Sequence, residues 1–80
     1  MIIKGLTPAV DIALGPDTVT DSGLISVINT NASATLVASG AMTVMISAGE
    51  RVVIEKKPGD TIDAPQAASG VWATGVAYKA

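Results

Sequence analysis

The sequence predicts an all-β fold, a small β-sandwich (Ig-like or jelly-roll-like) of about seven to eight short antiparallel strands. The first observation is a series of apolar runs of strand length, rich in Val, Ile and Thr, which suit a pleated surface. The second is the Gly, Asn and Pro residues that separate these runs at short intervals and permit tight turns. The third is the alternation of apolar and polar residues within two of the runs.

The middle of the chain holds the clearest strand predictions, with turns at Gly40 and Gly49. The predicted strands are Leu24–Asn29, Ala34–Ser39, Met42–Ser47 and Arg51–Lys57. Alternation in the second and third of them predicts one inward face, made of Leu36, Met42, Val44 and Ile46. The outward face is then predicted to hold Thr35, Ser39, Thr43 and Ser47.

The same stretch has two other readings. The outward-face residues recur every four positions, as in a helix stripe, but Gly40 and the many β-branched residues disfavour a helix. The run from Gly23 to Gly49 has no charge and is long enough to cross a bilayer. Ser, Thr, Asn and Gly interrupt it throughout, however, and neither an aromatic belt nor a basic flank marks its ends.

The flanking segments predict further short strands. Ala9–Leu14 is expected to alternate, with Val10, Ile12 and Leu14 on one side. Lys57-Pro58-Gly59-Asp60 has the pattern of a type II turn. Additional strands are predicted at Thr18–Thr20, Thr61–Ala64 and Val71–Tyr78.

Length and composition indicate one domain, residues 1–80, with little core material. Hydrophobic residues make up 49% of the chain, but 13 of them are Ala, and there is no Phe, one Trp and one Tyr. Without cysteine, disulfides cannot stabilise so short a chain. We therefore expect self-association, as a homo-oligomer, or docking on a larger partner. The net charge of −2 argues against nucleic acid, and the first residues do not form a secretion signal.

No catalytic signature is present, and the sequence predicts no enzyme, no cofactor and no metal site. His and Cys are absent, which removes the usual triads and metal ligands. The acidic residues fall at predicted turns and strand ends, where carboxylates are usually solvated, and no phosphate-binding glycine loop occurs. Trp72 and Tyr78 fall on one face of the predicted last strand, either as heavy core or interface residues or as a sugar-stacking pair.

Three segments of the chain carry a recognisable pattern. The first is a strand ending in V-I-N-T at Val27–Thr30, and the second is S-A-G-E-R-V-V-I-E-K-K-P-G-D-T, which includes Ala48–Thr61. The third is A-T-G-V-A-Y at Ala73–Tyr78. In this order the segments resemble small virion proteins of marine tailed phages. The resemblance covers residues 23 to 78 and implies a non-enzymatic structural role on the particle.

The resemblance implies a capsid decoration or cement protein that docks on the head shell and binds the major capsid protein or another virion protein. The charge and the interrupted apolar run predict that it binds neither nucleic acid nor membrane. Such a protein is made in the host cytoplasm and resides on the virion, at the head surface. The alternative is a carbohydrate- or protein-binding module of a phage tail or fibre. The interface is expected at Ile2, Ile3, Leu6, Trp72 and Tyr78. Residues 1–14 are read either as a contact arm or as an ordinary first strand of the same sandwich.

Overall fold

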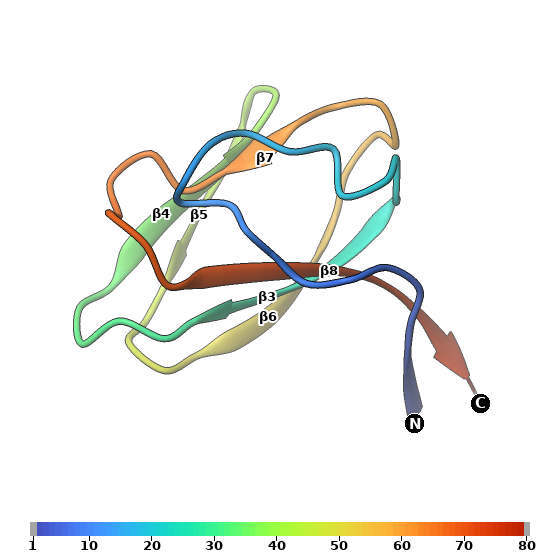
Figure 1. Ribbon diagram of the computed structural model, residues 1–80, viewed down its shortest axis with the longest axis horizontal. Coiled ribbons are helices and arrows are strands. Elements are labelled where there is room, and N and C mark those ends of the chain that lie inside the picture. Colours follow the sequence, from blue (N-terminus) through green and yellow to red (C-terminus); the bar gives the residue numbers. More distant parts are fainter. Residues whose placement is uncertain (1, 80) are drawn as a thin grey trace.

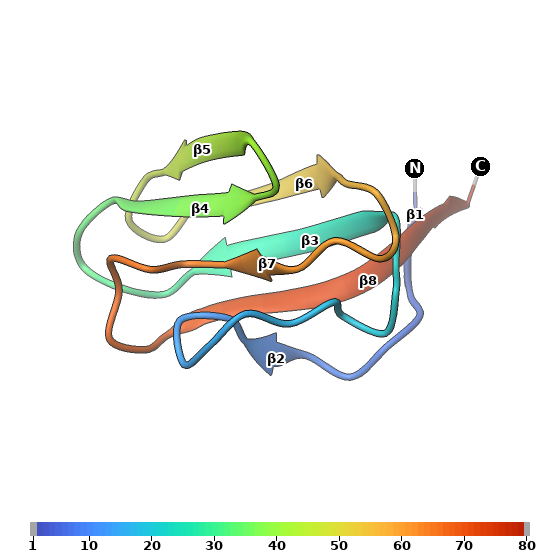
Figure 2. The same cartoon turned by 90° about the horizontal axis from the view of Figure 1, so that it is seen from above.

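The computed structural model describes residues 2–79, with side chains for residues 3–77, and shows two antiparallel sheets facing each other (Figures 1 and 2). The larger sheet has the order β1-β8-β3-β6, and β2 pairs with β8 beside β1. The smaller sheet has the order β5-β4-β7. The strands are β1 (Ile2–Gly5), β2 (Val10–Asp11), β3 (Leu24–Asn29), β4 (Thr35–Ser39), β5 (Met42–Ile46), β6 (Arg51–Glu55), β7 (Ile62–Asp63) and β8 (Val71–Lys79). The predicted all-β sandwich is thus confirmed, and no helix occurs in residues 2–79.

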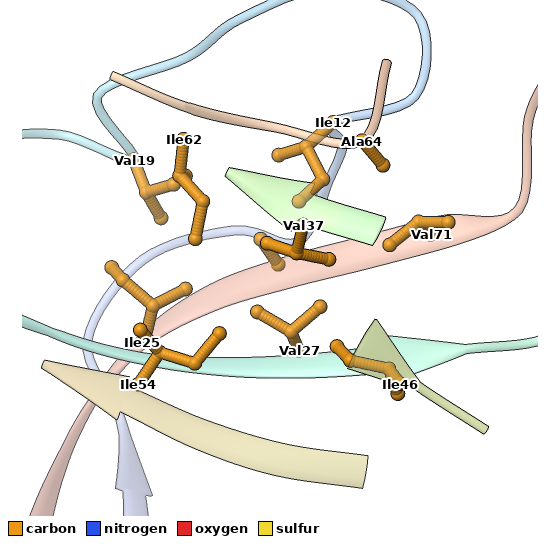
Figure 3. Close-up of a cluster of buried hydrophobic side chains, with 11 residues drawn as sticks. Ile12, Val19, Ile25, Val27, Val37, Ile46, Ile54, Ile62, Ala64 and Val71 are labelled. Atoms are coloured by element: carbon orange, nitrogen blue, oxygen red, sulfur yellow. The ribbon is translucent and has the colours of Figure 1, made fainter. Parts of the chain in front are cut away.

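The core fills the space between the two sheets. From the larger sheet, Ile25, Val27 and Ile54 point towards Val37 and Ile46 of the smaller sheet (Figure 3). The cluster also contains Ile62 of β7, Val71 and Ala73 of β8, and the loop residues Ile12, Val19 and Ala64. Because these side chains are mostly Val, Ile and Ala, the core is thin and depends on contact between both sheets.

The predicted inward face of the β4–β5 hairpin is correct for β5 but wrong for β4. Ile46 is buried, whereas in β4 the buried residues are Thr35, Val37 and Ser39, and Leu36 is only half-buried. The cause is the two-residue turn, which makes Ser39 the direct partner of Met42 and so places both on the same face. The Ser39 hydroxyl is satisfied there, because it donates to the Thr61 carbonyl oxygen at 2.9 Å.

The segment before β3 differs most from the prediction. Only Val10–Asp11 forms a strand, and Leu14 is 74% exposed instead of sharing a face with buried Ile12. The Asp11 side chain ends the strand by accepting a hydrogen bond from the Ala13 N–H at 3.0 Å, an Asx turn.

Residues 18–20, predicted as a strand, lie in a turn instead. Val19, Thr20 and Asp21 have φ angles of 52°, 54° and 54°, so three successive non-glycine residues are left-handed. This conformation costs about 1–2 kcal/mol per residue. The Asp17 carboxylate accepts the Val19 N–H at 2.6 Å, and the Val19 side chain is buried in the core. These interactions offset the strain.

The predicted turns lie where the sequence places them. Gly40 and Gly49 have φ angles of 58° and 74°, values that only glycine adopts readily. At Pro58-Gly59 the Asp60 N–H donates to the Lys57 carbonyl oxygen at 3.0 Å, which confirms a turn. Gly59 has no positive φ, however, so the prediction of type II is wrong and the turn is of type I character.

The side chain of Asn29, at the end of β3, joins the two sheets. It is fully buried, and its amide nitrogen donates to the carbonyl oxygens of Ser33, Ile46 and Ser47 at 2.9, 3.2 and 3.3 Å. Its amide oxygen accepts the Asn31 N–H at 3.0 Å. One side chain therefore satisfies backbone groups in the connection that follows β3 and others at the end of β5.

Replacing Asn29 tests this junction. Asn29→Ala removes four bonds to buried or part-buried backbone groups, so we expect a loss of about 2–3 kcal/mol in the free energy of unfolding. Asn31→Ala is the control, because that amide makes one exposed bond, to the Ser69 carbonyl oxygen, and should cost less than about 1 kcal/mol. Urea denaturation followed by circular dichroism gives both values. Equal losses of stability in the two variants would show that Asn29 does not hold the two sheets together.

The Thr35 hydroxyl tests the corrected face of β4. It is buried with no hydrogen-bond partner among the described residues. Thr35→Val removes the unpaired polar group at nearly constant volume, so we expect stabilisation by about 1 kcal/mol. Thr43→Val, on the exposed face of β5, should change stability by less than about 0.5 kcal/mol. Destabilisation by Thr35→Val in thermal melts would mean that the hydroxyl has a partner.

Candidate interaction surface

The outer face of the larger sheet, the side turned away from the core, is the candidate interaction surface. Strand pairing aligns side chains on it in rows that run across the sheet. One row consists of Trp72, Ile28 and Arg51, and the next consists of Thr74, Ser26 and Val53. Leu24 and Val76 occupy the following outward positions of β3 and β8. None of the apolar members of this face belongs to the core cluster.

This outer face is more apolar than an ordinary solvated sheet face. Leu24, Ile28 and Val53 are half-buried by their neighbours, and Val76 is 5% exposed. Trp72 is 41% exposed and is the largest side chain on the face. Between the apolar rows, Ser26 and Thr74 add hydroxyl groups. A face with an aromatic residue, aliphatic neighbours and a few polar groups has the composition of a protein-interface core.

The first strand extends this face as a projecting ribbon. Residues 2–5 pair with residues 76–79 of β8, beyond the part of β8 that pairs with β3 (Figure 1). Ile3, opposite Tyr78, is 43% exposed, and the register puts it on the same side of the sheet as Trp72. A ribbon of two strands alone is marginally stable in water, so burial against a partner would stabilise it.

The five residues expected at an interface do not all come together. Trp72 and Ile3 share the outer face, about 20 Å apart along β8 at the usual rise per residue. Leu6 is 54% exposed, but its N–H pairs with the Gly75 carbonyl oxygen, so it lies on the opposite side of the ribbon. The side chains of Ile2 and Tyr78 lie outside the described part; their backbones pair with Lys79 and Ile3.

A hollow borders the outer face where β3 begins and β6 ends. It has a volume of about 550 Å³ and is lined by Gly23, Leu24, Glu55, Lys56, Lys57 and Pro58. The Lys56 ammonium is not free to bind a ligand there, because it donates to the carbonyl oxygens of Lys57 and Pro58 at 3.3 and 2.9 Å. Leu24 belongs to the outer face and also lines the hollow, so the apolar surface extends into it.

The described residues offer little else for chemistry. Among them, no group of three or more His, Cys, Asp or Glu side chains is placed to hold a metal ion. Likewise, nothing in residues 2–79 forms a helix long and apolar enough to cross a membrane.

Sequence reasoning missed the residues that make the face continuous, Leu24, Ile28, Val53 and Val76. A signal was present, since Leu24-Ile25-Ser26-Val27-Ile28 and Val52-Val53-Ile54 are apolar at both odd and even positions. Such runs indicate strands with apolar side chains on both faces of the sheet.

Comparison of the chain with protein-family models, with curated proteins and with solved structures finds no match.

Deleting residues 1–5 tests whether β1 is part of the domain core. Because β1 pairs only with the projecting end of β8, we expect the truncated protein to stay folded. The bond from the Leu6 N–H to the Gly75 carbonyl oxygen shows that Ala77 and Lys79 direct their N–H groups at β1. These two amide hydrogens should lose protection from hydrogen exchange, whereas those of residues 71–75 should keep it because β3 and β2 pair there. Global unfolding of the truncated protein would show that β1 belongs to the core.

Proposed function

We propose that this chain is a non-enzymatic docking protein of a phage particle, a decoration protein that binds the outside of the head shell. The observation that supports it most directly is the apolar outer face of the larger sheet, centred on rows that contain Trp72 and Ile28. The phage character comes from the resemblance of residues 23 to 78 to small virion proteins of marine tailed phages. In this proposal the partner is the major capsid protein.

The proposed mechanism is stabilisation by binding. A subunit that binds only the assembled shell shifts the equilibrium towards assembly by its binding free energy. The outer face supplies the energy through burial of apolar surface, and Trp72 acts as the anchor. The β1–β8 ribbon adds a second contact, in which the shell covers Ile3 and orders the two strands. In this role the contact arm is shorter than the expected residues 1–14 and consists of residues 1–5, because Val10–Asp11 pair with β8 and Ile12 lies in the core.

A carbohydrate-binding module of a tail or fibre is the second candidate. The exposed Trp72 supports it, because sugar rings stack on aromatic faces that remain open to solvent. Asp11 lies opposite Trp72 in the sheet, but its carboxylate already accepts the N–H groups of Ala13 and Gly70 at 3.0 and 2.8 Å. Because the chain has one Trp, a change in its fluorescence on titration with glycans tests this candidate directly.

Substitution of Trp72 tests docking. We expect Trp72→Ala to weaken co-sedimentation with purified heads by roughly 30-fold, about 2 kcal/mol, as for an interface hot spot. Met45→Ala is the matched control, because Met45 is 59% exposed on the smaller sheet and should leave docking unchanged. If both substitutions weaken co-sedimentation equally, or if Trp72→Ala leaves it unchanged, the outer face is not the docking surface.

The number of copies in purified particles separates the two candidates. Quantitative mass spectrometry should find the chain at a copy number comparable to that of the major capsid protein if it decorates the head. A few copies per particle would indicate a tail or fibre component, and absence from the particle would overturn the virion role.

A further inference from the structure

Strand β6 is an edge strand whose free side consists of three residues. β6 pairs with β3, and no other strand in residues 2–79 covers its second side. The hydrogen bonds from Lys56 N–H to the Gly23 carbonyl oxygen and from Asn29 N–H to the Glu50 carbonyl oxygen fix the phase of the ladder. Even-numbered residues of β6 therefore bond to β3, and the N–H and C=O groups of Arg51, Val53 and Glu55 face away from it. An exposed row of this kind is a template for another strand.

The charges along this free side are symmetric about Val53. Arg51 stands two residues before it and Glu55 two residues after it, with opposite signs, and both are exposed on the outer face. If a second β6 approaches antiparallel with Val53 opposite Val53, Arg51 of each copy lies opposite Glu55 of the other. The same register pairs the three residues whose backbone groups are free, so every pair is of the hydrogen-bonded type, with Cα atoms about 5.5 Å apart.

From this coincidence of backbone phase and charge we infer that β6 pairs with β6 of a second copy of this chain around a twofold axis at Val53. The two larger sheets then form one continuous sheet, in the order β1-β8-β3-β6-β6-β3-β8-β1. Six backbone hydrogen bonds and two ion pairs link the copies. Val52 of each copy, half-buried at the open edge of the sandwich, lies opposite Ile54 of the other. The inference stands on β6 alone and does not depend on a virion role.

The register is selective because other pairings lose these features. A shift by two residues places neither Arg51 nor Glu55 opposite its counter-charge, and it shortens the ladder. A shift by one residue places the free N–H and C=O groups of one copy opposite backbone groups of the other copy that already bond to β3. The edge strand β5 has no charged residue in Met42–Ile46, so nothing comparable selects a partner there.

Two neighbouring charges extend the symmetry but are occupied within the chain. Glu50 accepts the Ser47 N–H at 2.9 Å, and the ammonium of Lys56 donates to its own loop. The ion pairs of the interface are therefore those of Arg51 and Glu55.

Charge reversal tests the register. A pairing of five residues buries less surface than a standard stable interface, so we expect the full chain to dimerise only at high micromolar to about 1 mM concentration. Arg51→Glu or Glu55→Arg each creates two like-charge pairs, and either should weaken the dimer at least about tenfold in sedimentation equilibrium. The double reversal R51E/E55R restores opposite charges and should restore the dimer.

Mixing the two single variants makes the test specific to this register. A chain with Arg51→Glu presents two carboxylates, and a chain with Glu55→Arg presents two guanidinium groups. The mixture should form the heterodimer in preference to either homodimer, which native mass spectrometry distinguishes when the two chains differ in mass. Dimers that ignore both reversals, or a heterodimer no stronger than the homodimers, would overturn the β6 pairing.

A backbone variant gives an independent readout. Val53→Pro removes an N–H that faces away from β3, which a folded edge strand tolerates, but it deletes hydrogen bonds at the twofold axis. Thr43→Pro is the control at the free side of β5, the other sheet's edge. We expect Val53→Pro to abolish the dimer and Thr43→Pro to keep it. A monomeric wild-type chain at about 1 mM, or a Val53→Pro dimer of unchanged affinity, would refute the inference.

Discussion

The buried amide of Asn29 is the interaction on which the arrangement of the two sheets depends. Backbone groups near the ends of β3 and β5 turn inwards where the two layers meet, and in a core of Val, Ile and Ala they have no water to bond to. The Asn29 side chain, which belongs to the larger sheet, bonds to carbonyl groups of the β3–β4 connection and of the end of β5. The neighbouring bond between the Gly49 N–H and the Asn29 carbonyl oxygen, 2.8 Å long, holds the β5–β6 turn against β3. The thin apolar core can therefore be closed at this end without unpaired polar groups.

The fold class and the main strands could be predicted because β-branched runs and Gly turns are local signals. The inward face of β4 could not be read from polarity, since Thr35 and Ser39 are polar and buried. The length of the two-residue turn decides which side of β4 faces the core, because it makes Ser39 the direct partner of Met42. The left-handed turn at Val19 had only a weak local signal, since Asp21 is the one residue of the three that tolerates such angles. The turn is held both by the local bond from the Val19 N–H to Asp17 and by burial of Val19 among residues far along the chain.

The candidate surface was predictable only in part, for a related reason. Trp72 stands out in the sequence because it is the one Trp of a chain poor in aromatic residues, and Ile3 because it lies in the apolar run near residue 1. Their neighbours on the face, such as Ile28 and Val53, are identified only by the register between β3, β6 and β8. The same register shows which backbone groups of β6 are free. Both the apolar face and the open edge therefore depend on which strands pair and in which register. Strand pairing is the feature that is hardest to predict from a single sequence.

Strand β8 has a further consequence, for the order of events during synthesis. It is the last of these eight strands to leave the ribosome, yet it lies inside the larger sheet and pairs with β1, β2 and β3. Strands β1 and β2 have no partner until then, so the larger sheet is complete only after translation of the segment Val71–Lys79. Until then one side of β3 is unpaired in the nascent chain, which exposes an apolar strand to neighbouring chains on the same polysome.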